Sequence, residues 1–347
     1  MSFSPGITTE PMPAGFRLSS AGKFAAGCLA LMIGSAILAG WMPLGFSIVT
    51  VFLFAGPHNW IEARYFLARM PGRWGRLRTF FLCALAGIVL LPAGFALLPL
   101  LARAWRWEEP GWNLAWGTWN SLLVLWTALL VNLRSRQNPR RDWSWTVPLA
   151  LALVGLAWIA PAWWGLSLVY LHPLMALWIL DREIRRSRPQ WRRTYHKLLA
   201  FLPVVLGILC WRLQDMPSLP GEDLLTQRIT QHAGGNILSG ISTHLLVAVH
   251  TFLEMLHYGV WLLAIPLVGL RNAVPWRVSQ VPMARRSPAW KKGLQFFLVI
   301  GAAAVLFLWA GFLADYPATR DVYFTLAMVH VLAEVLLPGT WAIPAPQ

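Results

Sequence analysis

Residues 238–268 read LSGISTHLLVAVHTFLEMLHYGVWLLAIPLV. The stretch contains one acidic residue, Glu254, and no Lys or Arg, and it is longer than the roughly 20 apolar residues that a membrane-spanning helix needs. It therefore predicts a transmembrane helix. Because of its length, we expect this helix to be tilted, kinked near Pro266, or extended beyond the bilayer.

Nine further stretches have the same apolar character. A soluble domain carries roughly 25 % charged residues, whereas this chain of 347 residues has 12 % charged and 57 % hydrophobic residues. That leaves too little polar surface for a soluble globule, and the hydrophobic fraction also excludes a disordered chain. We predict an all-α, polytopic integral membrane bundle with about ten transmembrane helices, at residues 24–40, 44–67, 79–102, 112–133, 145–160, 162–181, 196–213, 238–268, 291–314 and 320–337.

The positions of Lys and Arg test this topology. A net charge of +15 would suggest nucleic acid as the partner of a soluble protein. In a membrane protein, Lys and Arg instead collect in cytoplasmic loops and set the orientation. With the N-terminus placed inside, most of the 29 Lys and Arg residues fall in inside segments, loop after loop. This alternation predicts cytoplasmic termini, the lipid bilayer as partner and no nucleic acid.

The chain divides into three predicted segments. Residues 1–23 are rich in Pro and poor in apolar side chains, so we expect a disordered N-terminal tail. Residues 24–337 form the bundle, and residues 338–347 form a C-terminal tail. Residues 214–237 are the longest outside connection, which we expect to be a loop with one amphipathic turn.

A His-x-x-x-Glu motif occurs in three of the predicted spans, each running from outside to inside. Four residues turn a helix by about 400°, so the two side chains share one face roughly 6 Å apart. Placing a titratable group inside the bilayer costs free energy, so such residues are functional candidates by default. The residues are His58 and Glu62, His250 and Glu254, and His330 and Glu334, with His172 on a fourth span of the same direction.

Imidazole and carboxylate groups together suit iron, manganese or zinc. The step from Glu254 to His257 also has the spacing by which bundle helices chelate iron or manganese. We therefore predict a metal site in the inner half of the bilayer. Its candidate ligands are His58, Glu62, His172, His250, Glu254, His257, His330 and Glu334.

Two other interpretations of the motif stay open. The His and Glu pairs can be hydrogen-bonded pairs that fix helix packing, or they can form a proton or ion path. His250 lies about 10 Å above His257 along the helix, so the two do not easily bind one ion.

Three side chains near the histidines are candidate catalytic residues. Asn59 follows His58 and can orient a ligand or bind substrate, and Tyr258 can donate a proton or a hydrogen bond. Glu254 is a candidate for the same catalytic work. Pro57 and Pro173 flank site histidines, and each frees a backbone carbonyl and kinks its helix, which helps to open a cavity at that depth.

The segments Gly56-Pro57-His58 and His250 to Trp261 resemble the bacterial membrane-embedded carotene-cleaving dioxygenases of the Brp/Blh type. In that family, a Pro-His motif on an early span and histidines on later spans are thought to hold one iron ion, which an isoprenoid substrate reaches laterally. The resemblance implies that His58 and His257 are iron ligands and that the location is the bacterial inner (plasma) membrane. The family motif continues with Gly and Asp where this chain has Asn59 and Glu62, and this chain has more predicted spans.

These observations favour a membrane-embedded, metal-dependent oxygenase or oxidoreductase with non-haem iron and a lipid-soluble substrate. Manganese and zinc are alternative metals. The first alternative function is a haem protein with paired axial histidines, which the three Glu residues disfavour. The second is a transporter or proton-coupled channel that uses the His and Glu pairs as a relay. The sequence does not predict an oligomeric state.

Overall fold

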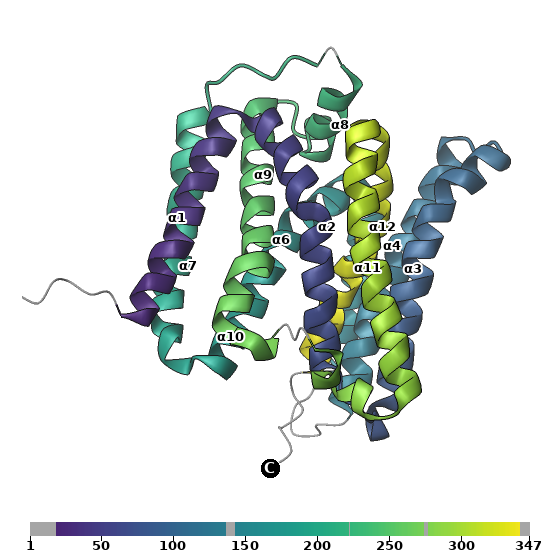
Figure 1. Ribbon diagram of the computed structural model, residues 1–347. Coiled ribbons are helices and arrows are strands. Elements are labelled where there is room, and N and C mark those ends of the chain that lie inside the picture. The colour runs from purple at the N-terminus through teal and green to yellow at the C-terminus, as the bar shows by residue number, and fades with distance from the viewer. Residues whose placement is uncertain (1–18, 137–142, 222, 274–276, 341–347) are drawn as a thin grey trace, which may run out of the picture.

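The computed structural model describes residues 19–136, 143–221, 223–273 and 277–340, and these residues form helices joined by short connections (Figure 1). The elements are α1 (Ser20–Trp41), α2 (Pro43–Arg69), η1 (Gly75–Leu77), α3 (Arg78–Ala104), α4 (Glu109–Ser135), α5 (Thr146–Ile159), α6 (Pro161–Ser187), η2 (Pro189–Trp191), α7 (Arg192–Leu213), α8 (Leu224–His232), α9 (Thr243–Gly259), η3 (Val260–Ala264), α10 (Ile265–Ala273), η4 (Val278–Gln280), η5 (Pro282–Arg285), α11 (Pro288–Ala314) and α12 (Tyr316–Thr340).

The predicted class, a polytopic all-helical membrane bundle, is confirmed. Eight helices of the described residues are long and apolar enough to cross a membrane. The predicted stretches 145–160 and 320–337 correspond to α5 and α12, which are not among the eight. The α5 helix has only 14 residues, and α12 has 25 residues that include Arg320 and Glu334.

The structure refines the predicted segment boundaries. The α1 helix begins at Ser20, inside the predicted tail 1–23, because Ser19 caps it by accepting a hydrogen bond from the Gly22 amide. Residues 1–18 and 341–347 lie outside the described residues, whereas α12 extends into the predicted C-terminal tail, to Thr340. The outside connection 214–237 contains α8, a nine-residue helix that Asp223 caps. Hydrogen bonds from Thr226 hold the pKa of the Asp223 carboxyl below its usual value.

The α9 helix and its continuation lie at the centre of the bundle. In the membrane-spanning window of Thr243–Gly269, 72 % of the residues are buried, against 6 % in the window of α11. The α9 helix packs against α1, α2, α6 and α7, while α3 and α4 pair at the far side of α12 (Figure 1). Polar side chains on α9 are therefore shielded from lipid by the surrounding helices.

Proline and a π-turn make the central helices irregular. Pro57 lies inside α2 and Pro173 lies inside α6, next to His58 and His172 respectively. Each proline lacks the amide hydrogen that would bond the carbonyl four residues earlier. After α9, the five residues of η3 form a π-helical turn, a local widening that is frequent at functional sites. These irregular turns therefore lie next to the histidines in their helices.

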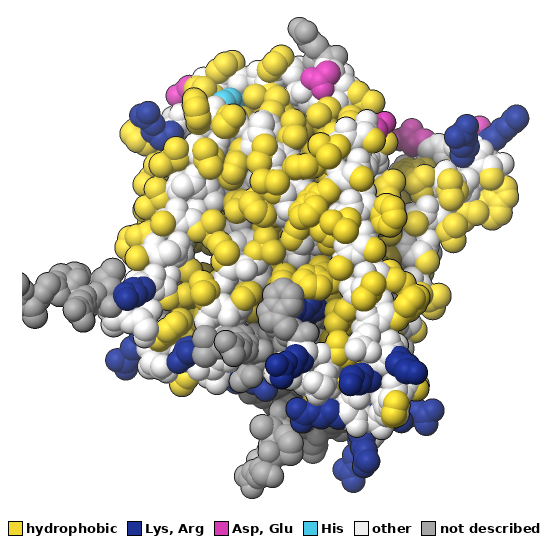
Figure 2. All heavy atoms as spheres, viewed as in Figure 1, with side chains coloured by type: hydrophobic (Ala, Val, Ile, Leu, Met, Phe, Trp, Pro, Cys, Tyr) yellow, Lys and Arg dark blue, Asp and Glu magenta, His cyan; other side chains and the backbone are white. Residues whose placement is uncertain are grey.

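The surface has the polarity of a membrane protein. Apolar side chains cover the middle of the visible face, and Lys and Arg gather toward one end (Figure 2). This end, which we call the basic end, is where α2 and α6 finish and where α3, α7 and α11 begin. The opposite end carries α8 (Figure 1).

Candidate metal centre

Three helices bring four side chains that could ligate a metal ion to one point in the bundle interior. His58 and Glu62 lie one turn apart on α2, His257 lies on α9, and His330 lies on α12. One donor atom from each side chain lies within 4.8 Å of the other three. His58 and Glu62 are fully buried, and His257 is 2 % exposed. We call these four residues the His/Glu cluster.

The local structure of α2 orients His58. Its Nδ1 atom lies 2.9 Å from the carbonyl oxygen of Phe54, one turn earlier. A carbonyl oxygen can only accept a hydrogen bond, so Nδ1 carries a proton, and in the neutral ring Nε2 keeps its lone pair. The Nε2 atom is buried without a hydrogen-bond partner. His58 therefore offers a neutral imidazole to a cation.

The polar atoms of the cluster fit a metal ion. Buried polar side-chain atoms normally have a hydrogen-bond partner, because desolvating a polar group without one costs free energy. Several atoms of the cluster are buried without such a partner, and a cation bound between them would satisfy them together. They are His58 Nε2, Glu62 Oε1 and Oε2, His257 Nδ1 and Nε2, and His330 Nδ1.

His172 and Glu334 lie beside the cluster and orient one of its members. Glu334 Oε1 accepts a hydrogen bond from Trp261 Nε1 at 3.1 Å, and its Oε2 lies 3.2 Å from His172 Nδ1. His172 Nε2 in turn lies 3.2 Å from His330 Nε2. His172 thus lies between Glu334 and the cluster residue His330, and one of the two facing Nε2 atoms donates a hydrogen bond to the other.

The imidazole rings crowd around one centre. The ring of His58 lies 5.3 Å from that of His257 and 5.1 Å from that of His330, measured between centroids. His172 lies 4.6 Å from His257 and 5.2 Å from His330. A haem with paired axial histidines needs two facing imidazoles with a flat macrocycle between them. Here, other imidazoles and Glu62 fill that space, so the geometry suits a bare ion.

No family model, curated protein or solved structure matches the chain. The chemistry of the cluster therefore follows from its donor atoms. Three imidazoles and one carboxylate are ligands that iron, manganese and zinc accept. Glu62 in the cluster and Glu334 behind His172 supply two negative charges when ionised, which balance the charge of a divalent ion in a dry site.

The predicted catalytic residues lie on one side of the cluster. The Tyr258 ring lies 4.2 Å from the ring of His58, and its hydroxyl donates to Glu254 Oε1 at 2.8 Å. Glu254 therefore binds Tyr258 and lies outside the His/Glu cluster. Asn59 is half-buried, with an unpartnered Oδ1. These side chains can offer a hydroxyl and an amide next to His58.

His250 lies apart from the cluster, as its position one turn before Glu254 requires. Its ring lies 5.0 Å from that of His232 and 5.9 Å from that of Tyr170. Burial, together with the nearby His250 and Arg320, holds the pKa of the α8 residue His232 well below its ordinary value, so this imidazole is neutral. The predicted ligand set thus divides into the cluster, its supports His172 and Glu334, and an outer group.

Two further side chains of α12 belong to this region. Tyr323 is 2 % exposed, and its hydroxyl interacts with Tyr258 and Asn59. Arg320, the first residue of the predicted span 320–337, is 4 % exposed on α12, and its guanidinium lies 4.6 Å from the centroid of the Phe324 ring. Tyr323 lies seven residues before His330 and therefore on the same face of α12. The spacing in the sequence could have identified it as a neighbour of the site.

Proposed function

We propose that the protein is an integral-membrane metalloenzyme. It holds one non-haem iron ion at His58, Glu62, His257 and His330 and uses dioxygen to oxidise a lipid-soluble substrate. The observation that carries this proposal is the convergence of the four donor atoms within 4.8 Å of one another. The resemblance at His58 and His257 to the carotene-cleaving dioxygenases agrees with the proposal, which also places the protein in the bacterial inner membrane.

The surroundings of the cluster favour redox chemistry on an apolar molecule. The cluster lies among membrane-spanning helices, where lipid-soluble molecules and dioxygen are concentrated relative to water. Iron accepts mixed imidazole and carboxylate ligands and leaves positions open in oxygenases. When bound, the ion would supply the redox chemistry. The chain's own residues would fix its ligands through Phe54 and His172 and place the Tyr258 ring beside His58, with its hydroxyl bonded to Glu254.

A proton relay is the second candidate function. His250, Glu254 and Tyr258 lie at successive helical turns of α9 and form a polar row from His232 toward His58. Rows of titratable groups in membrane helices conduct protons in pumps and transporters. This function requires no metal at the cluster, so metal content separates the two candidates.

Metal analysis of the purified protein tests the proposal. We expect stoichiometric iron without a haem Soret band. His58→Ala and His330→Ala should each lose most of the bound iron, because each removes a ligand. His196→Ala and His232→Ala are matched controls and should keep it, since His196 pairs with Asp181 at 2.7 Å and His232 lies in the outer group. A metal-free wild-type protein, or unchanged iron in both cluster variants, would reject the proposal.

A further inference from the structure

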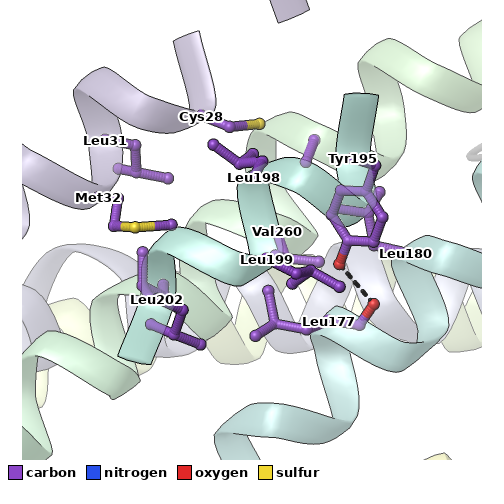
Figure 3. A pocket seen from close by; sticks show the side chains of 12 residues that line it. Cys28, Leu31, Met32, Leu177, Leu180, Tyr195, Leu198, Leu199, Leu202 and Val260 are labelled. Carbon is purple, nitrogen blue, oxygen red and sulfur yellow. Dashed lines mark hydrogen bonds between the residues drawn. The ribbon is translucent and has the colours of Figure 1, made fainter. Parts of the chain in front are cut away.

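An apolar cavity lies between α1, α6, α7 and the turn from α9 to η3, against the helix that carries His257 (Figure 3). Its volume is about 40 Å³. The lining side chains are aliphatic or sulfur-containing, apart from one tyrosine. They include Cys28, Met32, Tyr195, Leu199, Leu256 and Val260.

The cavity offers no polar group to a ligand. The one hydroxyl in its lining, that of Tyr195, donates to the Leu177 carbonyl at 2.7 Å (Figure 3). Water needs two to four polar partners to occupy a buried cavity, so apolar cavities stay dry and bind small apolar molecules such as xenon. We expect this cavity to behave in the same way.

The cavity lies where α1 and α7 pack against the helix that carries His257. Leu256 and Val260 line the cavity and lie on either side of the cluster residue His257 in the sequence. Trp261, which follows Val260, donates a hydrogen bond to Glu334. On the opposite wall, Cys28 and Leu199 are only partly buried. A small apolar molecule in the cavity would therefore contact the helix that carries His257 directly, through Leu256 and Val260.

We propose that this cavity is a dioxygen-binding site that supplies the metal centre from the membrane. The inference rests on the proposed function and names the entry route of its gaseous co-substrate. A buried water molecule needs a cavity of roughly 10–15 Å³. This cavity has a volume of about 40 Å³, which is enough for a diatomic molecule but too small for the chain of a lipid. Dioxygen is apolar and dissolves better in hydrocarbon than in water, which favours this occupant.

Crystals of the full chain under xenon pressure test the cavity directly. We expect an anomalous xenon peak between Met32, Leu199 and Val260. Leu199→Trp should abolish this peak by filling the cavity from α7, and Met32→Trp should do so from α1 if the first variant folds poorly. Val204→Trp is the matched control, because Val204 is 54 % exposed on the lipid side of α7, and it should keep the peak. Leu199→Ala should raise the xenon occupancy.

Nitric oxide, a diatomic analogue of dioxygen, tests the route to the metal. In stopped-flow experiments on the anaerobic ferrous protein, Leu199→Trp should slow nitric oxide association by roughly tenfold, equivalent to about 1.4 kcal/mol in the barrier. Iron content should stay unchanged, and Val204→Trp should bind at the wild-type rate.

Three results would overturn the inference: no xenon in the wild-type cavity, a lipid chain in its place, or a wild-type nitric oxide rate in both filled variants. These failures are distinguishable from failure of the proposed function. A protein without iron rejects the function, whereas iron with an unoccupied or irrelevant cavity rejects only the route.

Discussion

At His58, one hydrogen bond determines the chemistry of the ring. The carbonyl of Phe54 fixes a proton on Nδ1, and Nε2 is buried without a hydrogen-bond partner, so it is available as a metal ligand. At His330, the Nε2 atom shares a hydrogen bond with His172 Nε2, and Nδ1 is buried without a hydrogen-bond partner. Both imidazoles thus have hydrogen-bond partners outside the His/Glu cluster, an arrangement that orients the rings and raises ligand basicity in metal sites.

The two acids closest to the histidines should behave differently. Glu62→Gln should weaken iron binding by more than about 100-fold, since loss of an outer partner alone weakens metal affinity by roughly 10–100-fold. Glu254→Gln should leave the affinity within about threefold of wild type, a difference of less than 1 kcal/mol, because Glu254 binds Tyr258 outside the cluster. Competition with a chelator measures both affinities. Equal losses in the two variants would contradict the assignment of Glu62 as the ligand.

At the scale of the helix, α9 and η3 serve three roles on different faces. His257 contributes to the cluster, Tyr258 and Glu254 form the polar row, and Leu256 and Val260 line the cavity. The π-turn of η3 follows directly and presents Trp261 to Glu334. A widened turn shifts the helix register by part of a turn, so the positions before and after it can face different neighbours.

Helices α3 and α4 approach each other closely at Gly87 of α3. A Cβ atom on Gly87 would lie 2.0 Å from Trp126 Nε1, and this indole donates to the Cys83 carbonyl at 2.9 Å. Any side chain at position 87 must displace the indole and break this hydrogen bond. Gly207 on α7 faces open space instead, with nothing within 4 Å of a Cβ atom.

We therefore expect Gly87→Ala to destabilise the protein by about 1–3 kcal/mol through overpacking. Gly207→Ala should be neutral or stabilising by up to about 1 kcal/mol, because alanine favours the helix and meets no neighbour. Thermal unfolding of both variants in detergent micelles measures the difference. A Gly87→Ala protein as stable as Gly207→Ala would show that the helices separate freely at this point.

For the whole molecule, charge asymmetry predicts the orientation in the membrane. Lys and Arg gather at the basic end, whereas the opposite end, with α8, carries acidic side chains (Figure 2). Cytoplasmic loops attract basic residues, so the basic end should face the cytoplasm. The cavity and the cluster then lie between the two surfaces and are reached from the lipid.

Cysteine labelling in intact bacterial cells checks this orientation. In a variant with Cys28, Cys83 and Cys210 replaced by Ala, a membrane-impermeant maleimide should label Gln231→Cys in intact cells. Gln190→Cys should react only after the cells are permeabilised. Gln190 lies in η2 at the basic end and Gln231 lies in α8, and both side chains are exposed. The reverse pattern would show that the basic end faces outward.

Much of the architecture follows from local sequence. The apolar stretches and the alternating loop charges predict the helices, and the three His-x-x-x-Glu motifs identify the helices that carry the site. The local sequence does not predict which of the candidate ligands lie in the cluster and which lie outside it. The same motif places Glu62 in the cluster, Glu334 behind His172, and Glu254 on Tyr258. Spacing within a helix fixes a shared face but carries no information on the helix opposite.

Hydropathy, loop charge and the turn of a helix act over a few residues, and the sequence alone therefore determined a membrane bundle with histidines and acids at matching depths. The tertiary structure decided which of these side chains meet, that Arg320 is buried, and that a cavity opens behind His257. The rotation of each helix about its axis sets these contacts. Packing against neighbours that lie far apart in the chain fixes that rotation.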